Sequence, residues 1–220
     1  MSVAIDRDRL WRWFESFVAA DTLVPGGENR VDPLDPRLAR FAHHVAAPAF
    51  EELGGTVEVD RLNNAVASFG QRTGEELLLL GYPALHHGNE MQDPLQARRV
   101  EGPDGRELWV GLGASQSKGG LAAICAAVAA LRESGVDPAG RVLVGICSEG
   151  SSTHESSTVL YESLDPLPAG AVLTVGTRNQ ISLGNRGRVG AAGEILVDAA
   201  LKEVVVRRGP GEQGHGRAEF

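Results

Sequence analysis

Side chains that can bind metal ions gather in two short segments of the sequence. The first segment contains His86, His87 and Glu90, and the second contains Glu149 and His154. Imidazole and carboxylate groups are ligands that zinc and related divalent ions take in proteins. Both segments are therefore candidates for a metal site, provided that the fold brings them together.

A third segment offers a possible nucleophile. Ser115 and Lys118 have the Ser-x-x-Lys spacing of one class of hydrolases, in which a lysine assists a serine. A structural role is the alternative, because Lys118 precedes Gly119 and Gly120 at the predicted start of a helix. There a lysine can hold the loop in place, while glycine allows a close backbone approach. We favour the structural role.

Two apolar runs predict the strands that position these segments. Residues 77–80 and 142–147 are continuously apolar, as in strands buried on both faces, and the Ala-rich residues 119–134 between them predict a helix. Strand, crossover helix and strand in this order imply a parallel sheet. Ligand sites in such sheets lie beyond the carboxyl ends of the strands, which are followed here by residues 82–91 and 148–154.

The remaining patterns complete an α/β fold class, with a mostly parallel sheet flanked by helices. Apolar residues at helical spacing predict helices over residues 10–20 and 36–53. Short β-prone runs predict strands over residues 56–60, 65–69, 171–175, 180–183, 195–197 and 203–206, and residues 209–220 have the composition of a frayed tail. Of these strands, we expect residues 171–175 to be buried.

Composition excludes several classes of function. A formal net charge of −8 argues against nucleic-acid binding, which needs clustered Lys and Arg. No apolar run approaches the roughly 18 residues of a membrane span, and the first residues do not build a signal peptide. We therefore expect a cytoplasmic protein with no membrane partner. Cys125 and Cys147 lie in apolar segments and are expected to be buried, reduced thiols.

Residues 77–81, 108–123 and 142–150 resemble, in this order, motifs of the zinc aminoacylase and deacetylase family. That family includes acetylornithine deacetylase and succinyl-diaminopimelate desuccinylase. Its members have a strand ending in GHxD, a DPF loop, a segment similar to GRGasDmKGGlaa, and a strand ending in a DEEG-like motif. The middle segment, with Lys118-Gly-Gly, carries most of the resemblance. The similarity extends over about residues 8–190 and includes Asp93-Pro94.

The resemblance implies the first half of a zinc-peptidase-like catalytic domain. It implies a two-zinc site at the strand ends that activates a water, with a glutamate as general base, to hydrolyse an amide bond. The substrate would be a small N-acyl amino acid or a peptide. Glu149 matches a ligand position and Lys118 the lysine of the family motif, and we assign both to the catalytic site.

Five positions depart from the family pattern. Tyr82 stands at the first zinc histidine, Ala84 at the supporting aspartate, Gln116 at the bridging aspartate, Ser148 at the general base and Gly170 at about the later aspartate ligand. Two neighbouring divalent ions repel each other strongly, and a neutral amide is a poor bridge between them. The usual dizinc site is therefore not expected to form.

A rebuilt site that binds a single zinc or other divalent metal ion is the hypothesis under which the protein still has a metal cofactor. It would use His86, Glu149 and His154, with Gln116 or a water completing the shell. The alternative makes His86 and His87 a solvated loop pair and His154 a helix cap or surface residue. The sequence leaves both open.

Full members of the family return to the first domain after an inserted lid, and this sequence stops before that return. We therefore expect a truncated member with an N-terminal part of the catalytic domain over residues 1–186. Residues 187–220 would be the start of a lid or a tail. The parallel sheet would then have an open edge that a partner or a second copy of the chain covers.

Two functional interpretations remain. The first is a metal-dependent amidohydrolase, deacylase or metallopeptidase lineage with a degenerate or rebuilt metal site and weak or no activity in this chain. The second is a non-catalytic relic, a pseudoenzyme that uses the same fold to bind a ligand or partner. The loss of the general base at Ser148 favours the second, and the clustered His86, Glu149 and His154 favour the first.

Overall fold

The computed structural model describes residues 3–24, 31–70, 74–85, 91–136, 138–150 and 154–174, and the backbone of three further strands. The chain divides into two compact units, Met1–Arg178 and Asn179–Phe220. The predicted boundary between residues 186 and 187 lies outside the described residues. No helix in the described segments is long and apolar enough to cross a membrane.

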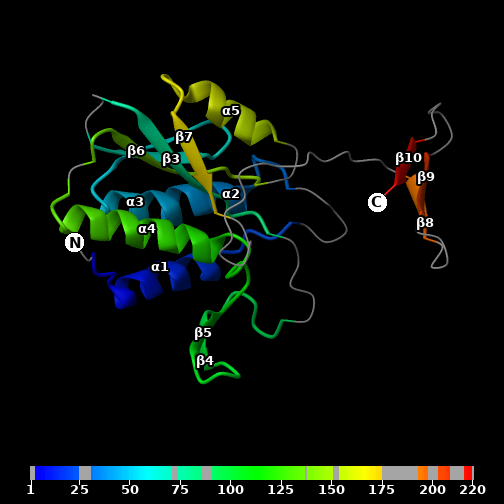
Figure 1. Cartoon of the computed structure of the whole chain (residues 1–220), viewed down its shortest axis with the longest axis horizontal. Coiled ribbons are helices and arrows are strands. Elements are labelled where there is room, and N and C mark those ends of the chain that lie inside the picture. Colours follow the sequence, from blue (N-terminus) through cyan, green and yellow to red (C-terminus); the bar gives the residue numbers. More distant parts are fainter. Residues whose placement is uncertain are drawn as a thin grey trace. The chain divides into compact units, whose positions relative to one another are not determined.

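The first unit begins with helices, continues with five strands and ends with helices and strands in turn (Figure 1). Its helices are α1 (Arg7–Ala19), α2 (Pro36–Phe41), α3 (Ala47–Glu52), α4 (Lys118–Glu133) and α5 (Glu155–Ser163), and the π-helical turn Ala42–Ala46 joins α2 to α3. Its strands are β1 (Thr56–Val59), β2 (Ala65–Phe69), β3 (Glu76–Gly81), β4 (Arg98–Glu101), β5 (Glu107–Val110), β6 (Arg141–Ile146) and β7 (Gly170–Leu173).

Five of these strands form a mixed sheet in the order β1-β2-β6-β3-β7. The central pair β3 and β6 is parallel, with Gly81 opposite Ile146, and β3 also pairs in parallel with β7. The pairs β1–β2 and β2–β6 are antiparallel. The expected α/β fold is confirmed, and its parallel half is the part that carries the strand ends of interest.

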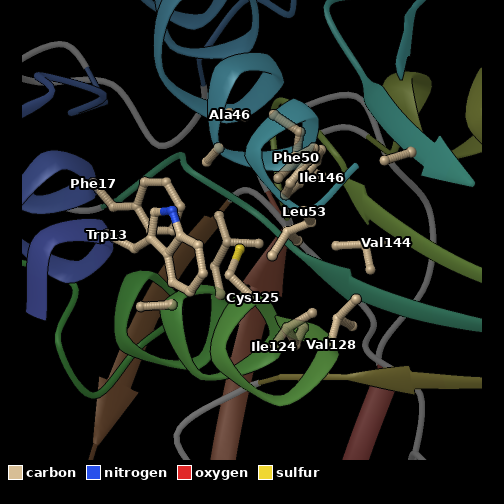
Figure 2. Packing of buried hydrophobic residues seen from close by; sticks show 14 of the residues in the cluster. Trp13, Phe17, Ala46, Phe50, Leu53, Ile124, Cys125, Val128, Val144 and Ile146 are labelled. Atoms are coloured by element: carbon tan, nitrogen blue, oxygen red, sulfur yellow. The ribbon is translucent and has the colours of Figure 1, made fainter. Parts of the chain in front are cut away.

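One face of the sheet is covered by α1, α3 and α4, which share a hydrophobic core with it (Figure 2). Phe17 of α1 and Phe50 of α3 are fully buried there, together with Val144 and Ile146 of β6. Helix α1 is preceded by the capping residue Asp6, whose side chain accepts hydrogen bonds from the Asp8 and Arg9 amides. This cap satisfies amides that have no partner within the helix.

Helix α5 belongs to the opposite face. Its Leu160 lines a cavity of about 340 Å³ together with Val66 and Leu143. Along their strands, Val66 and Leu143 alternate with the residues that face the helix-covered core, so they lie on the other face of the sheet. Among the described strands, β7 lies at one edge of this sheet, and Ala171, Val172 and Leu173 are exposed. The prediction of a strand near residues 171–175 is confirmed, but its expected burial is wrong, because β7 is an edge strand.

The second unit contains a three-stranded antiparallel sheet in the order β10-β9-β8. These strands are Gly193–Val197 (β8), Glu203–Arg208 (β9) and Gly216–Glu219 (β10). The first two agree with the predicted strands, whereas β10 lies in the predicted tail. Residues 180–183 lie outside the described residues.

Other elements also differ from the sequence prediction. The hairpin of β4 and β5 falls where only a loop was expected, and α5 was not predicted. The predicted helix over residues 36–53 consists of α2, the π-helical turn and α3. Both cysteines are buried and free, as expected.

Candidate active site at the carboxyl ends of the strands

The carboxyl ends of β3 and β6 bring two predicted site segments together. Gly81 and Ile146 are paired residues, and the Cys147 amide donates to the Gly81 carbonyl at 3.0 Å. Tyr82 and Ser148 therefore leave neighbouring strands at the same edge, as the parallel arrangement predicted. The turn 147–150 then closes with the Gly150 amide donating to the Cys147 carbonyl at 3.2 Å.

Tyr82 and Gln116, which stand at two family ligand positions, lie next to each other. Burial raises the pKa of the Tyr82 hydroxyl, and the neighbouring Gln116 side chain opposes the shift. Ser117 donates its hydroxyl to the Tyr82 carbonyl. A Cβ atom on Gly150 would lie 2.6 Å from the Tyr82 ring, so glycine lets the ring pack against this turn.

Ser148, at the position of the family's general base, is fully buried. Its hydroxyl donates to the Leu62 carbonyl at 2.6 Å, and its amide donates to Oδ1 of Asn64 at 2.9 Å. Asn64 also donates to the Ser156 carbonyl at 2.8 Å. These contacts fix the turn after β6 to the β1–β2 turn and to α5. The hydroxyl has no basic side chain among these partners, and its role here is structural.

Glu149 caps the start of α5. Its side chain is 1% exposed, and Oε1 accepts a hydrogen bond from the Ser156 amide at 2.8 Å. Ser156 is the second residue of that helix, so the carboxylate occupies the usual place of a side-chain cap at the positive end of the helix dipole. The Ser156 hydroxyl lies 3.1 Å from Sγ of Cys147. The one retained acidic position is therefore engaged within the protein.

His154 lies immediately before α5. It is exposed, its backbone has a φ of 67°, and its side chain makes no capping hydrogen bond. Its carbonyl accepts from the Thr158 hydroxyl at 2.8 Å. Glu149 and His154 thus both belong to the entrance of α5. His86, His87 and Glu90 lie outside the described residues.

Lys118 is buried and connects the site to α1. Its ammonium donates to the Ala20 carbonyl at 2.7 Å and lies 6.0 Å from the Phe41 ring centroid. Burial lowers its pKa from 10.5 to about 7, and the nearby Asp21 carboxylate opposes the shift. Ser115 is exposed, whereas the Lys118 side chain is enclosed. This arrangement agrees with the structural role for Lys118.

Two further positions at which the family has site residues are occupied here by residues that have no side-chain group able to bind a metal ion. Ala84 is buried in a small cluster with Val24, Val31 and Leu38. Gly170 begins the edge strand β7. A Cβ atom at Gly170 would only touch Leu77 at 3.6 Å.

The donor set in the described segments does not fit a metal ion. No three His, Cys, Asp or Glu side chains come together there in a way that could hold one. Glu149 and His154 could supply donors to a rebuilt centre only with further groups, and the proposed third ligand, His86, is not among the described residues. Sequence reasoning missed Asn64 and Ser156, because small polar residues carry no distinctive signal before the fold places them.

Comparison with known proteins yields structural similarity alone. No protein-family model and no curated protein sequence matches the chain. Human carnosine dipeptidase 1 is similar in structure, with a TM-score of 0.58 and 21% identity over 77% of this chain and 38% of that one. The dipeptidase Dug1p from Saccharomyces cerevisiae has a TM-score of 0.54 and 13% identity over 71% of this chain and 35% of its own.

The chain therefore spans less than half the length of either dipeptidase. At these identities the similarity concerns the fold. It confirms, at that level, the resemblance drawn from residues 77–81, 108–123 and 142–150. The chain has the α/β fold of part of a dipeptidase, the fold that its likeness to the zinc aminoacylase and deacetylase family implied.

Proposed function

We propose that the chain comes from the amidohydrolase and metallopeptidase lineage and that its strand-end site has lost the dizinc chemistry of amide hydrolysis. The fold shared with dipeptidases supports the lineage. The neutral side chains of Tyr82 and Gln116 and the internal hydrogen bonds of Ser148 and Glu149 support the loss. These are the positions that would have to supply ligands, the metal bridge and the general base.

Glu149 carries the proposal. A carboxylate that ligates a metal presents its oxygens to the ion, whereas Oε1 of Glu149 accepts from the Ser156 amide in a buried setting. Removing the carboxylate from this cap would leave a helix-end amide without its partner, which costs about 1 kcal/mol. Oε1 would thus have to exchange this structural contact for a metal bond.

A rebuilt centre with zinc or another divalent metal is the competing proposal. Glu149 and His154 both lie at the start of α5, which favours it, and His86 and Gln116 are the further ligands that it needs. If it exists, the chain could still act on an N-acyl amino acid or a peptide. The two proposals differ in whether the protein retains metal.

Metal analysis and a hydrolysis assay distinguish them. The purified full chain is loaded with zinc, dialysed, and assayed with N-acetyl amino acids and dipeptides. We expect no stoichiometric metal and no hydrolysis above the protein-free control. Stoichiometric zinc that is lost in both His86→Ala and His154→Ala, but kept in His43→Ala as the matched control, would overturn the proposal and establish the rebuilt site.

A further inference from the structure

A concave site lies at the end of the sheet opposite the strand-end site, where β2 ends and β6 begins. It is a cavity of about 240 Å³ lined mostly by apolar side chains. The lining comes from the end of β2, the last turns of α4, the segment after α4 and the start of β6. Its apolar members are Phe69, Val128, Leu131, Val136, Pro138 and Val142.

The floor of this groove is formed by side chains of the hydrophobic core. Phe69 is 6% and Val128 3% exposed, and both belong to the main hydrophobic core. Val136 forms the rim and is 39% exposed. An apolar ligand would therefore meet preformed walls, which lowers the entropic cost of binding.

Arg132 is the charged group of the groove. Its guanidinium carbon lies 5.9 Å from the centroid of the Phe69 ring. Across the described segments, Arg132 has no side-chain hydrogen bond and no ion pair, whereas Arg9, Arg37 and Arg141 are all ion-paired. A guanidinium beside apolar walls and without an internal acid is suited to bind a carboxylate.

Two glycines shape the surroundings of Arg132. A Cβ atom on Gly54 would lie 2.2 Å from Nη1 of Arg132, and a Cβ atom on Gly55 would lie 2.7 Å from the Phe69 ring. The Gly54-Gly55 pair, which ends the α3 region, thus leaves the space that the guanidinium and the ring occupy. Larger residues there would displace both.

The two acids that line the adjoining cavity with Arg132 are balanced by other arginines. Glu52 forms ion pairs with Arg9 and Arg12, and Glu133 forms one with Arg9, so two arginines face two carboxylates. The carboxyl end of α4 adds about half a negative charge, which reduces but does not cancel the charge of the guanidinium. The groove therefore keeps a net attraction for an anion.

We propose that this groove binds a small monocarboxylate with an apolar body, its carboxylate on Arg132 and its hydrocarbon part on Phe69, Val128 and Val142. The site lies at the opposite end of β6 from Tyr82 and Glu149. It uses none of the residues of the strand-end site and does not depend on the function proposed for that site.

Calorimetric titration of the full chain with octanoate tests the proposal. We expect saturable binding of one octanoate per chain, with a Kd between about 10 µM and 1 mM for a ligand of this size. Acetate, which lacks the apolar body, should not show saturable binding in this range. Octylamine, which carries the opposite charge, should bind about tenfold more weakly or not at all.

Variants locate the site. Arg132→Gln should weaken octanoate binding about tenfold or more, and Arg132→Lys should recover part of it because the charge is kept. Arg61→Gln, which removes an exposed arginine elsewhere, should bind as the native chain does. Thermal unfolding verifies that each variant is folded. If Arg132→Gln does not fold, Arg132→Lys serves instead, and a preference for octanoate over octylamine in that variant would support the proposal. No saturable octanoate binding, or equal affinity in folded Arg132→Gln, would refute the proposal.

Discussion

Individual residues at the strand ends show how one side chain can serve either chemistry or structure. A glutamate oxygen can coordinate a metal ion or accept a hydrogen bond from a backbone amide, and Oε1 of Glu149 accepts one from the Ser156 amide. Tyr82 and Gln116 form a neutral pair of side chains where the family has a zinc histidine and a bridging aspartate. Such a pair needs no metal to balance its charge. The replacements thus form a mutually consistent set.

Lys118 gives a prediction for the pH dependence of stability. Because burial lowers its pKa to about 7 from 10.5, the folded chain holds this proton less tightly than the unfolded chain does. Stability is therefore highest above the unfolded pKa and falls as the pH decreases to about 7, with a slope of up to about 1.4 kcal/mol per pH unit. Below pH 7 this contribution levels off.

Urea unfolding at several pH values checks this prediction against Lys118→Met, which cannot titrate. Between pH 7 and 9.5 the unfolding free energy of the native chain should rise relative to that of the variant. The variant also loses the hydrogen bond to the Ala20 carbonyl, but that loss alone would shift the curve without changing its slope. Parallel curves over this range would show that Lys118 keeps an ordinary pKa.

At the scale of elements, the loop before α4 depends on a close approach that glycine permits. A Cβ atom at Gly119 would lie 2.1 Å from the Ala114 carbonyl oxygen, and that atom belongs to the backbone. Alanine in a helix normally stabilises by up to about 1 kcal/mol relative to glycine. Here the overlap should outweigh the helix propensity.

Gly119→Ala should therefore destabilise the chain by about 1–3 kcal/mol, measured by urea unfolding. Gly170→Ala is the matched control, because a Cβ atom there would meet only Leu77 at an ordinary contact distance of 3.6 Å. A Gly119→Ala chain at least as stable as the native one would mean that the loop before α4 can move away from the helix start.

The elements that sequence patterns predicted are those whose burial produces a strong pattern. Strands β3 and β6 lie at the centre of the sheet, and their apolar runs identified them. Helix α5 is rich in Ser and buries only Ser156 and Leu160, so it has almost no apolar stripe. The β4–β5 hairpin is largely exposed and contains several charged residues, which made it resemble a loop.

At the scale of the whole molecule, the described five-stranded sheet ends in an apolar edge. In β7, Val172 is 49% and Leu173 52% exposed, and the strand Gly-Ala-Val-Leu contains no charge or proline. Natural proteins usually protect edge strands with charges, prolines, bulges or covering segments, because unprotected edges pair with other chains. This edge remains the proposed contact for a partner or for a second copy of the chain.

Self-association through β7 is the corresponding prediction. Val172→Lys should lower the weight-average mass of the full chain at high concentration, measured by sedimentation equilibrium, because a buried lysine would oppose pairing at this edge. Val3→Lys is the matched control, as Val3 is also exposed, at 41%, but lies outside the sheet. Equal association of both variants and the native chain would exclude β7 as the contact.

The sequence by itself determined the fold class, the central strands, the edge at which the site segments meet, and the replaced family positions. It could do so because the periodicity of apolar residues and the spacing of motif residues are properties of short stretches of sequence. Tertiary structure alone decided that Glu149 caps α5, that Tyr82 lies beside Gln116, that Ser148 is hydrogen-bonded to Leu62 and Asn64, and that Arg132 faces Phe69. Each of these contacts joins residues on separate elements or turns, and the choice of partner depends on how the elements pack.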